Sequence, residues 1–208
     1  MPAWLLAFLA ALGGYLLGSI PTGYWVGRWW GGIDLRQAGS GSTGATNVLR
    51  TLGKGPALLV LLVDAAKGAA AVALGLALGS PWWVAVAALG AVVGHSRSCW
   101  LGFKGGKSVA TSLGILLAMA WPVALATFGV WLLGIALTRI VSFSSLLAAV
   151  AAPLLMWATA QPLPYRVFAL AGGIYVIGAH RRNIERLLAG SEPRLGQKWA
   201  QSSQFPTS

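Results

Sequence analysis

Two glycine-rich polar stretches contain the residue types best suited to chemistry in this sequence. The first, GSGSTGATN, covers residues 39–47, and the second, GFKGGKS, covers residues 102–108. Both are rich in unshielded backbone N–H groups, in hydroxyls and in nearby cations. Successive exposed amides form a concave nest for anions, and Lys or Arg adds positive charge. The two stretches therefore predict the binding of phosphorylated substrates.

The second stretch ends in Gly106-Lys107-Ser108, which looks like the end of an ATP-binding Walker A loop. That motif needs a Gly five residues before the second Gly, but position 101 is Leu101. It also follows a β-strand, whereas the segment before this stretch reads as a membrane span. We therefore reject an ATP-hydrolysing loop and retain a different kind of phosphate cradle.

The small number of acidic and metal-ligating side chains excludes several other chemistries. The acids are Asp34, Asp64, Glu185 and Glu192. Paired-carboxylate mechanisms and metal sites with several carboxylates are hard to build from so few. Two histidines and one distant cysteine do not make a zinc site. We therefore expect neither a metal nor another cofactor.

Both histidines lie at the ends of apolar segments, where a lone histidine is often a satisfied interfacial group. Neither is followed by Asp at the position required by the His-x4-Asp motif of coenzyme-A-dependent glycerolipid acyltransferases. His180 differs from His95 because Arg181, Arg182 and Asn183 follow it directly. This crowding makes His180 the better candidate for chemistry.

Three further polar residues lie within apolar segments or at their edges. Asp64 and Lys67 are three residues apart and share a helix face. Because unpaired charges in a membrane are costly, we expect a structural ion pair, with direct substrate contact as the alternative. Ser142 begins another segment, where it could cap the helix or hold an anion at the helix N-terminus.

The composition is that of an integral membrane protein. Hydrophobic residues make up 57% of the 208 residues, charged residues 9%, and the mean hydropathy is +0.72. A soluble domain carries roughly a quarter charged residues. The net charge of +11 raises the possibility of a nucleic-acid partner. However, the cations are scattered between apolar runs, as in cytoplasmic loops of membrane proteins, so we expect no nucleic acid.

Hydropathy predicts an all-α fold with seven transmembrane helices, some of them short, and six as the alternative. The apolar segments lie near 3–27, 55–79, 81–95, 108–120, 122–138, 140–160 and 166–180. Trp121-Pro122 predicts a break in an apolar run too long for one span. Glycines four residues apart, such as Gly14 and Gly18, predict close helix packing. Residues 1–190 form the expected single membrane domain, and 191–208 a polar, poorly ordered cytoplasmic tail.

The distribution of cations predicts the orientation. Thirteen of the 15 Lys and Arg residues fall in segments on one side of the predicted membrane. The positive-inside rule then places the N-terminus outside, and both glycine-rich stretches and the C-terminus in the cytoplasm. The first apolar run is long enough to span the bilayer and lacks a positive start, so we do not expect a cleaved signal peptide.

Taken in order, these motifs resemble the bacterial membrane family of acyl-phosphate:glycerol-3-phosphate acyltransferases. The resemblance covers roughly residues 10–196. It is carried by Gly18-Ser19-Ile20-Pro21, the first glycine stretch, Asp64-x-x-Lys67-Gly68, Gly94-His95, residues 103–111, Thr138-Arg139 with Ser142, and His180-Arg181-Arg182-Asn183-Ile184. The family usually has Asn, Pro and Gly where Ser42, Ser98 and Ser108 stand.

The resemblance implies a seven-helix enzyme of the bacterial inner membrane, with its active site at the cytoplasmic surface. Such an enzyme transfers a fatty acyl chain from acyl phosphate to the sn-1 hydroxyl of glycerol 3-phosphate, the first step of phospholipid synthesis. The products are lysophosphatidic acid and phosphate. Acyl phosphate is already activated, so no cofactor is expected. The expected partners are the two substrates and membrane lipid.

The resemblance also implies site residues at the matching positions. The residues expected in catalysis are His180, Asn183, Ser142 and Lys104. The residues expected to bind substrate are Ser40, Gly41, Gly44, Thr46, Asn47, Arg50, Gly105, Gly106 and Lys107. His180 or a substrate phosphate oxygen could take the proton of the attacking hydroxyl.

The alternative from another class is a small-anion membrane transporter. Transporters usually have a site at the midplane of the membrane, often between inverted repeats. In this sequence the polar stretches are predicted at one face, and no internal repeat is apparent. These features favour the enzyme.

Overall fold

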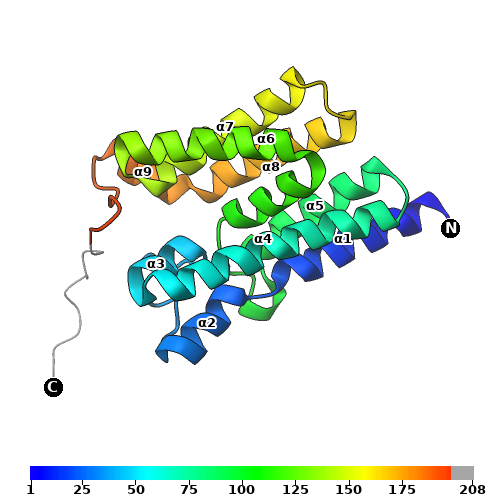
Figure 1. Ribbon diagram of the computed structural model, residues 1–208. Helices are drawn as coiled ribbons and strands as arrows, with labels where there is room; N and C mark the ends of the chain where they lie inside the picture. The colour runs from blue at the N-terminus through cyan, green and yellow to red at the C-terminus, as the bar shows by residue number, and fades with distance from the viewer. Residues whose placement is uncertain (198–208) are drawn as a thin grey trace.

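The structure, a computed structural model, describes residues 1–197, and the regular structure within them is entirely helical (Figure 1). The helices are α1 Ala3–Ser19, α2 Thr22–Gly31, α3 Ala45–Leu52, α4 Lys54–Ala77, α5 Pro81–Ser96, α6 Val109–Thr138, α7 Val141–Ala158, α8 Leu163–Ala179 and α9 Arg181–Leu188. A short 3₁₀ helix, Cys99–Leu101, follows α5. The prediction of an all-α fold is confirmed.

The first apolar segment, expected to be one helix over 3–27, is broken in the structure. α1 ends at Ser19, and α2 starts at Thr22 after Pro21. Proline has no backbone N–H and so cannot continue the hydrogen-bond ladder of a helix. The carbonyl of Ile20 accepts a hydrogen bond of 2.9 Å from Lys67 Nζ on α4. The break therefore leaves the carbonyl of Ile20 free to accept a hydrogen bond from the buried ammonium group of Lys67.

α6 contains the break predicted near Trp121-Pro122. Ala120 has φ −157° and ψ 75°, which are not helical values, and Pro122 follows two residues later. A proline inside a helix removes one backbone hydrogen bond and clashes with the preceding turn. Figure 1 shows the chain changing direction between the two halves of α6. The predicted segments 108–120 and 122–138 are thus two helical arms joined at a kink.

Small residues allow α1 and α5 to approach closely. A methyl group added at Gly14 or Gly18 would lie 2.0 or 2.2 Å from the backbone oxygen of Ala87 or Ala91. Backbones that approach this closely exclude any side chain. The four-residue spacing of these two glycines therefore packs two helices together.

The polar connections gather at one end of the helix bundle. α2, α3 and α9 lie at this end in Figure 1, and the N-terminus lies at the other. Within the described residues, five stretches are long and apolar enough to cross a membrane, and α8 is a shorter apolar helix. Seven crossings and the orientation of the termini stay predictions. What the fold does establish is that the two glycine-rich stretches and the turn after α8 lie at the same end.

Candidate functional site at one end of the helix bundle

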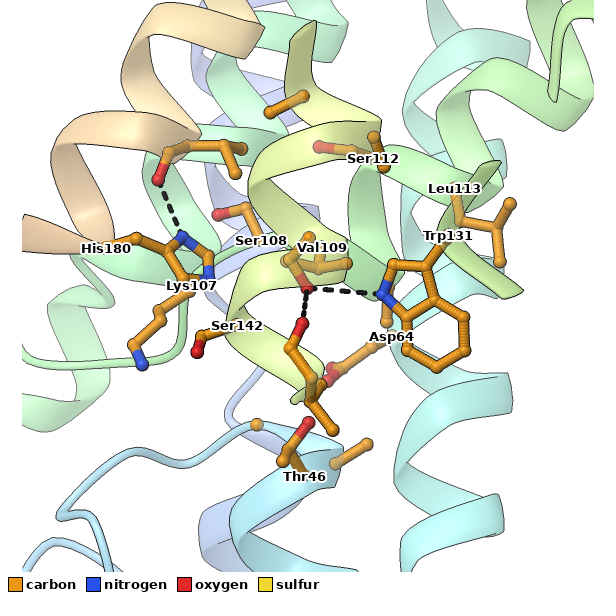
Figure 2. Close-up of a pocket in the computed structure, with 18 of the residues that line it drawn as sticks. Thr46, Asp64, Lys107, Ser108, Val109, Ser112, Leu113, Trp131, Ser142 and His180 are labelled. Carbon is orange, nitrogen blue, oxygen red and sulfur yellow. Dashed lines mark hydrogen bonds between the residues drawn. The ribbon is translucent and has the colours of Figure 1, made fainter. Parts of the chain in front are cut away.

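A cavity of about 420 Å³ opens among the polar connections and continues between the helices. Figure 2 shows Lys107, Ser142 and His180 at this cavity, with Trp131 on its wall. Along α7 the lining residues run from Val141 and Ser142 in the first turn to Ala152 deeper in the helix. The cavity thus joins a polar end to apolar walls.

The first glycine-rich stretch contributes Ser40, Ser42, Gly44 and Thr46 to the lining of the cavity, and Arg50 joins them from α3. Arg50 is half-buried, and its guanidinium donates to the carbonyl of Pro193 over 3.4 Å. Burial lowers its pKa, although the guanidinium group remains charged at any pH of interest. The stretch and the helix α3 therefore place three hydroxyls and one cation at the cavity.

Asn47 lines the cavity, but its side chain holds the first stretch together. Its Nδ2 donates to the carbonyls of Leu35, Ala38 and Ser42, and its Oδ1 accepts from the N–H of Ser40 over 2.9 Å. The side chain is 1% exposed. These contacts use its amide hydrogens and its oxygen, so the structure supports scaffolding in place of the expected substrate contact. Gly41 has a φ of +72° and does not line the cavity, so it shapes the turn.

The second stretch brings one of its two lysines to the cavity. Lys107 lines it and donates a hydrogen bond of 2.5 Å to Asn183 Oδ1. Burial lowers the pKa of Lys107 to about 8, a shift that nearby Glu192 opposes. Lys104 is exposed and does not line the cavity, so its expected catalytic role lacks structural support. Gly105 and Gly106 also lie outside the lining, packed against the end of α5.

Ser108, where the resembling family usually has glycine, has a left-handed backbone with φ +62°. Glycine adopts this conformation at lower cost than serine. The hydroxyl of Ser108 donates to the carbonyl of Val92 over 2.7 Å and lies 2.7 Å from Ser96 Oγ. The extra side chain therefore fastens the second stretch to α5, at a position that also lines the cavity.

His180 ends α8 and starts the turn into α9. Its Nδ1 lies 2.8 Å from the carbonyl of Val176. A carbonyl only accepts hydrogen bonds, so Nδ1 carries the proton and Nε2 of the neutral ring keeps a lone pair. Burial lowers the pKa of His180 to about 4, and the charge of Lys107 acts in the same direction. At neutral pH the ring is an uncharged hydrogen-bond acceptor.

Glu192, which lies in the segment predicted to be a polar tail, is at the centre of the site. Its carboxylate accepts hydrogen bonds from Ser142 over 2.8 Å, Asn183 over 2.6 Å and Arg186 over 2.6 Å. Burial by itself raises the pKa of this carboxyl, but the three donors outweigh that effect and lower it. The signal available in the sequence was an acid in a chain with only three others.

Residues 191–197 therefore differ from the poorly ordered tail that we expected to begin at 191. Besides Glu192, the N–H of Leu195 donates to the carbonyl of Arg139 over 2.7 Å, and Arg139 donates back to the carbonyl of Leu195 over 3.1 Å. The packed chain extends at least to these residues. The remainder of the expected tail, 198–208, lies outside the described residues.

Ser142 does not cap α7, although capping was one of the two roles predicted from its position in the sequence. The residue before the helix is Ile140, whose N–H is satisfied by Thr138 Oγ1 over 3.1 Å. Ser142 lies inside the first turn with its hydroxyl on Glu192. The side chain is thus fixed at the cavity by a carboxylate.

Asp64 and Lys67 form a buried ion pair of 2.8 Å, with both side chains less than 5% exposed. The three-residue spacing places both charges on one face of α4. Asp64 also lines the cavity, so its geometry leaves room for substrate contact as well. Within residues 1–197, no three His, Cys, Asp or Glu side chains gather into a group that could hold a metal.

This fold and site define a class of protein: a bundle of apolar helices with a cationic pocket at one end, joined to an apolar cavity. Residues 8–190 match the model of the family "Glycerol-3-phosphate acyltransferase". The chain belongs to this family.

Individual relatives agree with the family match. The chain is 93% identical over 202 residues to a glycerol-3-phosphate acyltransferase of Synechococcus sp. strain JA-3-3Ab, covering 97% of this chain and all of the relative. It is 53% identical to the same-named protein of Trichodesmium erythraeum strain IMS101, covering 88% and 90% of the two chains.

Two crystal structures of PlsY, an integral membrane glycerol 3-phosphate acyltransferase, share the fold. The glycerol 3-phosphate form matches with a TM-score of 0.87 and 39% identity over 91% of this chain and 96% of that one. The lysophosphatidic acid form matches with a TM-score of 0.85 and 37% identity over 91% and 95%. The chain described here is accordingly an integral membrane protein.

Proposed function

We propose that this chain transfers a fatty acyl group from acyl phosphate to the sn-1 hydroxyl of glycerol 3-phosphate. The products are lysophosphatidic acid and inorganic phosphate, and the reaction takes place at the cytoplasmic face of the bacterial plasma membrane. The observation that carries the proposal is the continuity of the cavity. A pocket with Arg50 and Lys107 opens onto apolar walls formed by α6, α7 and α8. Both substrates are phosphate anions, and one of them also carries a long apolar chain.

Lys107 and Arg50 hold the two phosphates in this proposal. Charge-assisted hydrogen bonds are roughly twice as strong as neutral ones, and a pocket shielded from water strengthens them further. The hydroxyls of Ser40 and Thr46 add contacts from the first glycine-rich stretch. We assign Lys104 no contact inside the cavity because its side chain is exposed.

In the reaction, the sn-1 oxygen of glycerol 3-phosphate attacks the carbonyl carbon of acyl phosphate. A new C–O ester bond forms, and the bond between that carbon and the bridging phosphate oxygen breaks. Phosphate leaves with the bonding electrons, and the hydroxyl proton must go to a base. Acyl phosphate is activated by its own leaving group, so the reaction needs no covalent enzyme intermediate.

A substrate phosphate oxygen is the stronger candidate for that base. Its second pKa is about 6, whereas the pKa of His180 is about 4. A base works best when its pKa lies near the working pH. His180 Nε2 then accepts a hydrogen bond that aligns the hydroxyl for attack. Asn183 and Ser142 maintain the surrounding geometry through Lys107 and Glu192.

The acyl chain lies along the apolar walls between α6, α7 and α8. Trp131, Ala149, Phe168 and Gly172 contribute to these walls. Burying each CH₂ group of a chain contributes about 0.8 kcal/mol. Burial of an acyl chain therefore explains why the cavity is deeper than a phosphate or a glycerol unit needs.

A donor assay on purified protein in detergent tests the proposal. The protein should form lysophosphatidic acid from glycerol 3-phosphate and palmitoyl phosphate, and should not use palmitoyl coenzyme A. Comparable turnover with both donors would reject the assignment of the donor. A small-anion transporter needs sealed vesicles to show activity, so product formation in detergent also separates the two classes.

A further inference from the structure

His95 has no role in the reaction proposed above, yet it is buried at the back of the second glycine-rich stretch. The residue is 7% exposed and lies in the last turn of α5. Its imidazole faces two groups. Nδ1 lies 3.7 Å from Asp64 Oδ1, and a methyl group added at Gly106 would lie 2.1 Å from Nε2. The ring therefore fills the space between a buried carboxylate and the glycine that precedes Lys107.

The same turn of α5 fixes the stretch on both sides of Lys107. The N–H of Gly106 donates to the carbonyl of His95 over 3.1 Å. One residue after the lysine, Ser108 Oγ donates to the carbonyl of Val92 over 2.7 Å. The backbone that carries Lys107 is thus held against α5 both before and after the lysine.

The groups behind the ring are themselves anchored. Asp64 is paired with Lys67, and Lys67 also donates to the carbonyl at the break between α1 and α2. A buried ion pair with this additional contact has little freedom to move. His95 consequently has a fixed support on one side and Gly106 on the other.

We propose that His95 is a positioning residue for the phosphate-binding lysine. Gly106 packs directly against its imidazole, and this contact sets the position of Lys107 in the cavity. The inference rests on the proposed function, because it assigns Lys107 to a substrate phosphate. His95 also lines the cavity, but its Nε2 lies against Gly106, and we assign the ring no contact with the reacting atoms.

A size-exchange experiment isolates this contact. Gly106 has a backbone that alanine can adopt, because its φ is not in the left-handed region. The obstacle to Gly106→Ala is therefore the His95 ring, and His95→Ala removes that obstacle. The His95→Ala variant keeps Lys67 paired with Asp64, so it leaves no isolated buried charge.

Gly105→Ala is the matched control. A methyl group added at Gly105 would lie 2.1 Å from the backbone oxygen of His95, which no change of side chain can move. Its defect should therefore persist in the His95→Ala background. The comparison separates contact with the ring from general crowding of the stretch.

His95→Ala, Gly105→Ala and Gly106→Ala should each raise the KM for one of the two phosphate substrates by about tenfold or more, with a smaller effect on kcat. In the His95→Ala background, Gly106→Ala should cost less than about threefold, because residues in contact show non-additive effects. All variants are purified in detergent, and their unfolding temperatures are compared. If His95 served only the stability of the fold, its replacement would lower the unfolding temperature without raising KM more than it changes kcat. It would also leave the effect of Gly106→Ala unchanged.

Two results would overturn the inference. In the first, Gly106→Ala behaves like the wild type. In the second, the effects of Gly106→Ala and His95→Ala on KM multiply in the double variant, as the effects of Gly105→Ala and His95→Ala are expected to do. Wild-type protein that forms no lysophosphatidic acid from acyl phosphate would instead contradict the proposed function, so the two failures are distinguishable.

Discussion

Lys107 and Asn183, 76 positions apart in the sequence, are joined by a hydrogen bond of 2.5 Å between Nζ and Oδ1. This bond links the second glycine-rich stretch to the turn that carries His180. Asn183 also donates to Glu192, so a cation, an amide and a carboxylate form one continuous set of contacts. These contacts therefore join three separate parts of the chain at the polar end of the cavity.

The two lysines of the second stretch should differ sharply on mutation. Lys107→Ala removes one of the two cations assigned to the substrate phosphates and should lower kcat/KM by about 10²–10³, as expected for the loss of one electrostatic stabiliser. Lys104→Ala changes an exposed side chain and should lower it less than about fivefold. Steady-state kinetics on both purified variants measure the difference. Equal loss in the two would show that Lys104 enters the site during the reaction.

The pH profile of kcat/KM should show no acidic limb caused by His180 near the ordinary histidine pKa. The pKa of His180 is lowered to about 4, so the ring is neutral and functional above that pH and becomes protonated only as pH falls through it. Wild type and His180→Ala should therefore show profiles of the same shape between about pH 5.5 and 8, at different absolute rates. A limb near pH 6.5 that disappears in His180→Ala would instead identify His180 as the base.

Removing the Glu192 carboxylate should destabilise the protein. Glu192→Ala removes the acceptor of the buried Ser142 hydroxyl and Asn183 amide, and each buried polar group left unpaired costs about 1–3 kcal/mol. The unfolding temperature should fall clearly, and exposed Glu185→Ala is the matched control. Because the folded pKa of Glu192 is lowered, its contribution is present above the unfolded pKa and is lost as pH falls through the folded pKa. The gap between wild type and Glu192→Ala should therefore narrow in acid.

Gly172 should determine how long an acyl chain the cavity accepts. It is buried on α8 and lines the cavity, and a methyl group added there would meet only the Phe168 ring, at 3.6 Å. Gly172→Leu should lower activity with palmitoyl phosphate by about tenfold or more while sparing shorter donors. Gly129→Leu is the control, because Gly129 is exposed and does not line the cavity. An unchanged chain-length profile in Gly172→Leu would place the acyl chain elsewhere.

The predicted orientation can be tested by cysteine labelling in intact cells. The positive-inside rule places positions 36 and 97 in the cytoplasm. Single cysteines at these positions, introduced after Cys99→Ala, should resist membrane-impermeant reagents and react once the cells are opened. Labelling of either position in intact cells would reverse the orientation.

Local features of the chain were predictable from sequence because they depend on residue type and short spacing. Most of the apolar helices followed from hydropathy, although the break between α1 and α2 did not, and the kink in α6 followed from Pro122. The Asp64–Lys67 pair followed from a three-residue separation on one helix face. The glycine-rich stretches also predicted where anions would bind, and this assignment stays a prediction.

The tertiary structure decided which of these polar residues meet. Lys104 and Lys107 look alike in sequence, yet only Lys107 lines the cavity, because the stretch is pinned to α5 on both sides of it. Asn47, expected from sequence to bind substrate, holds the first stretch together through its side-chain amide. Glu192 joined the site through hydrogen bonds with residues 9 and 50 positions away. Periodicity and composition encode which segments are helical and buried, but side-chain partners across long separations depend on how the helices pack.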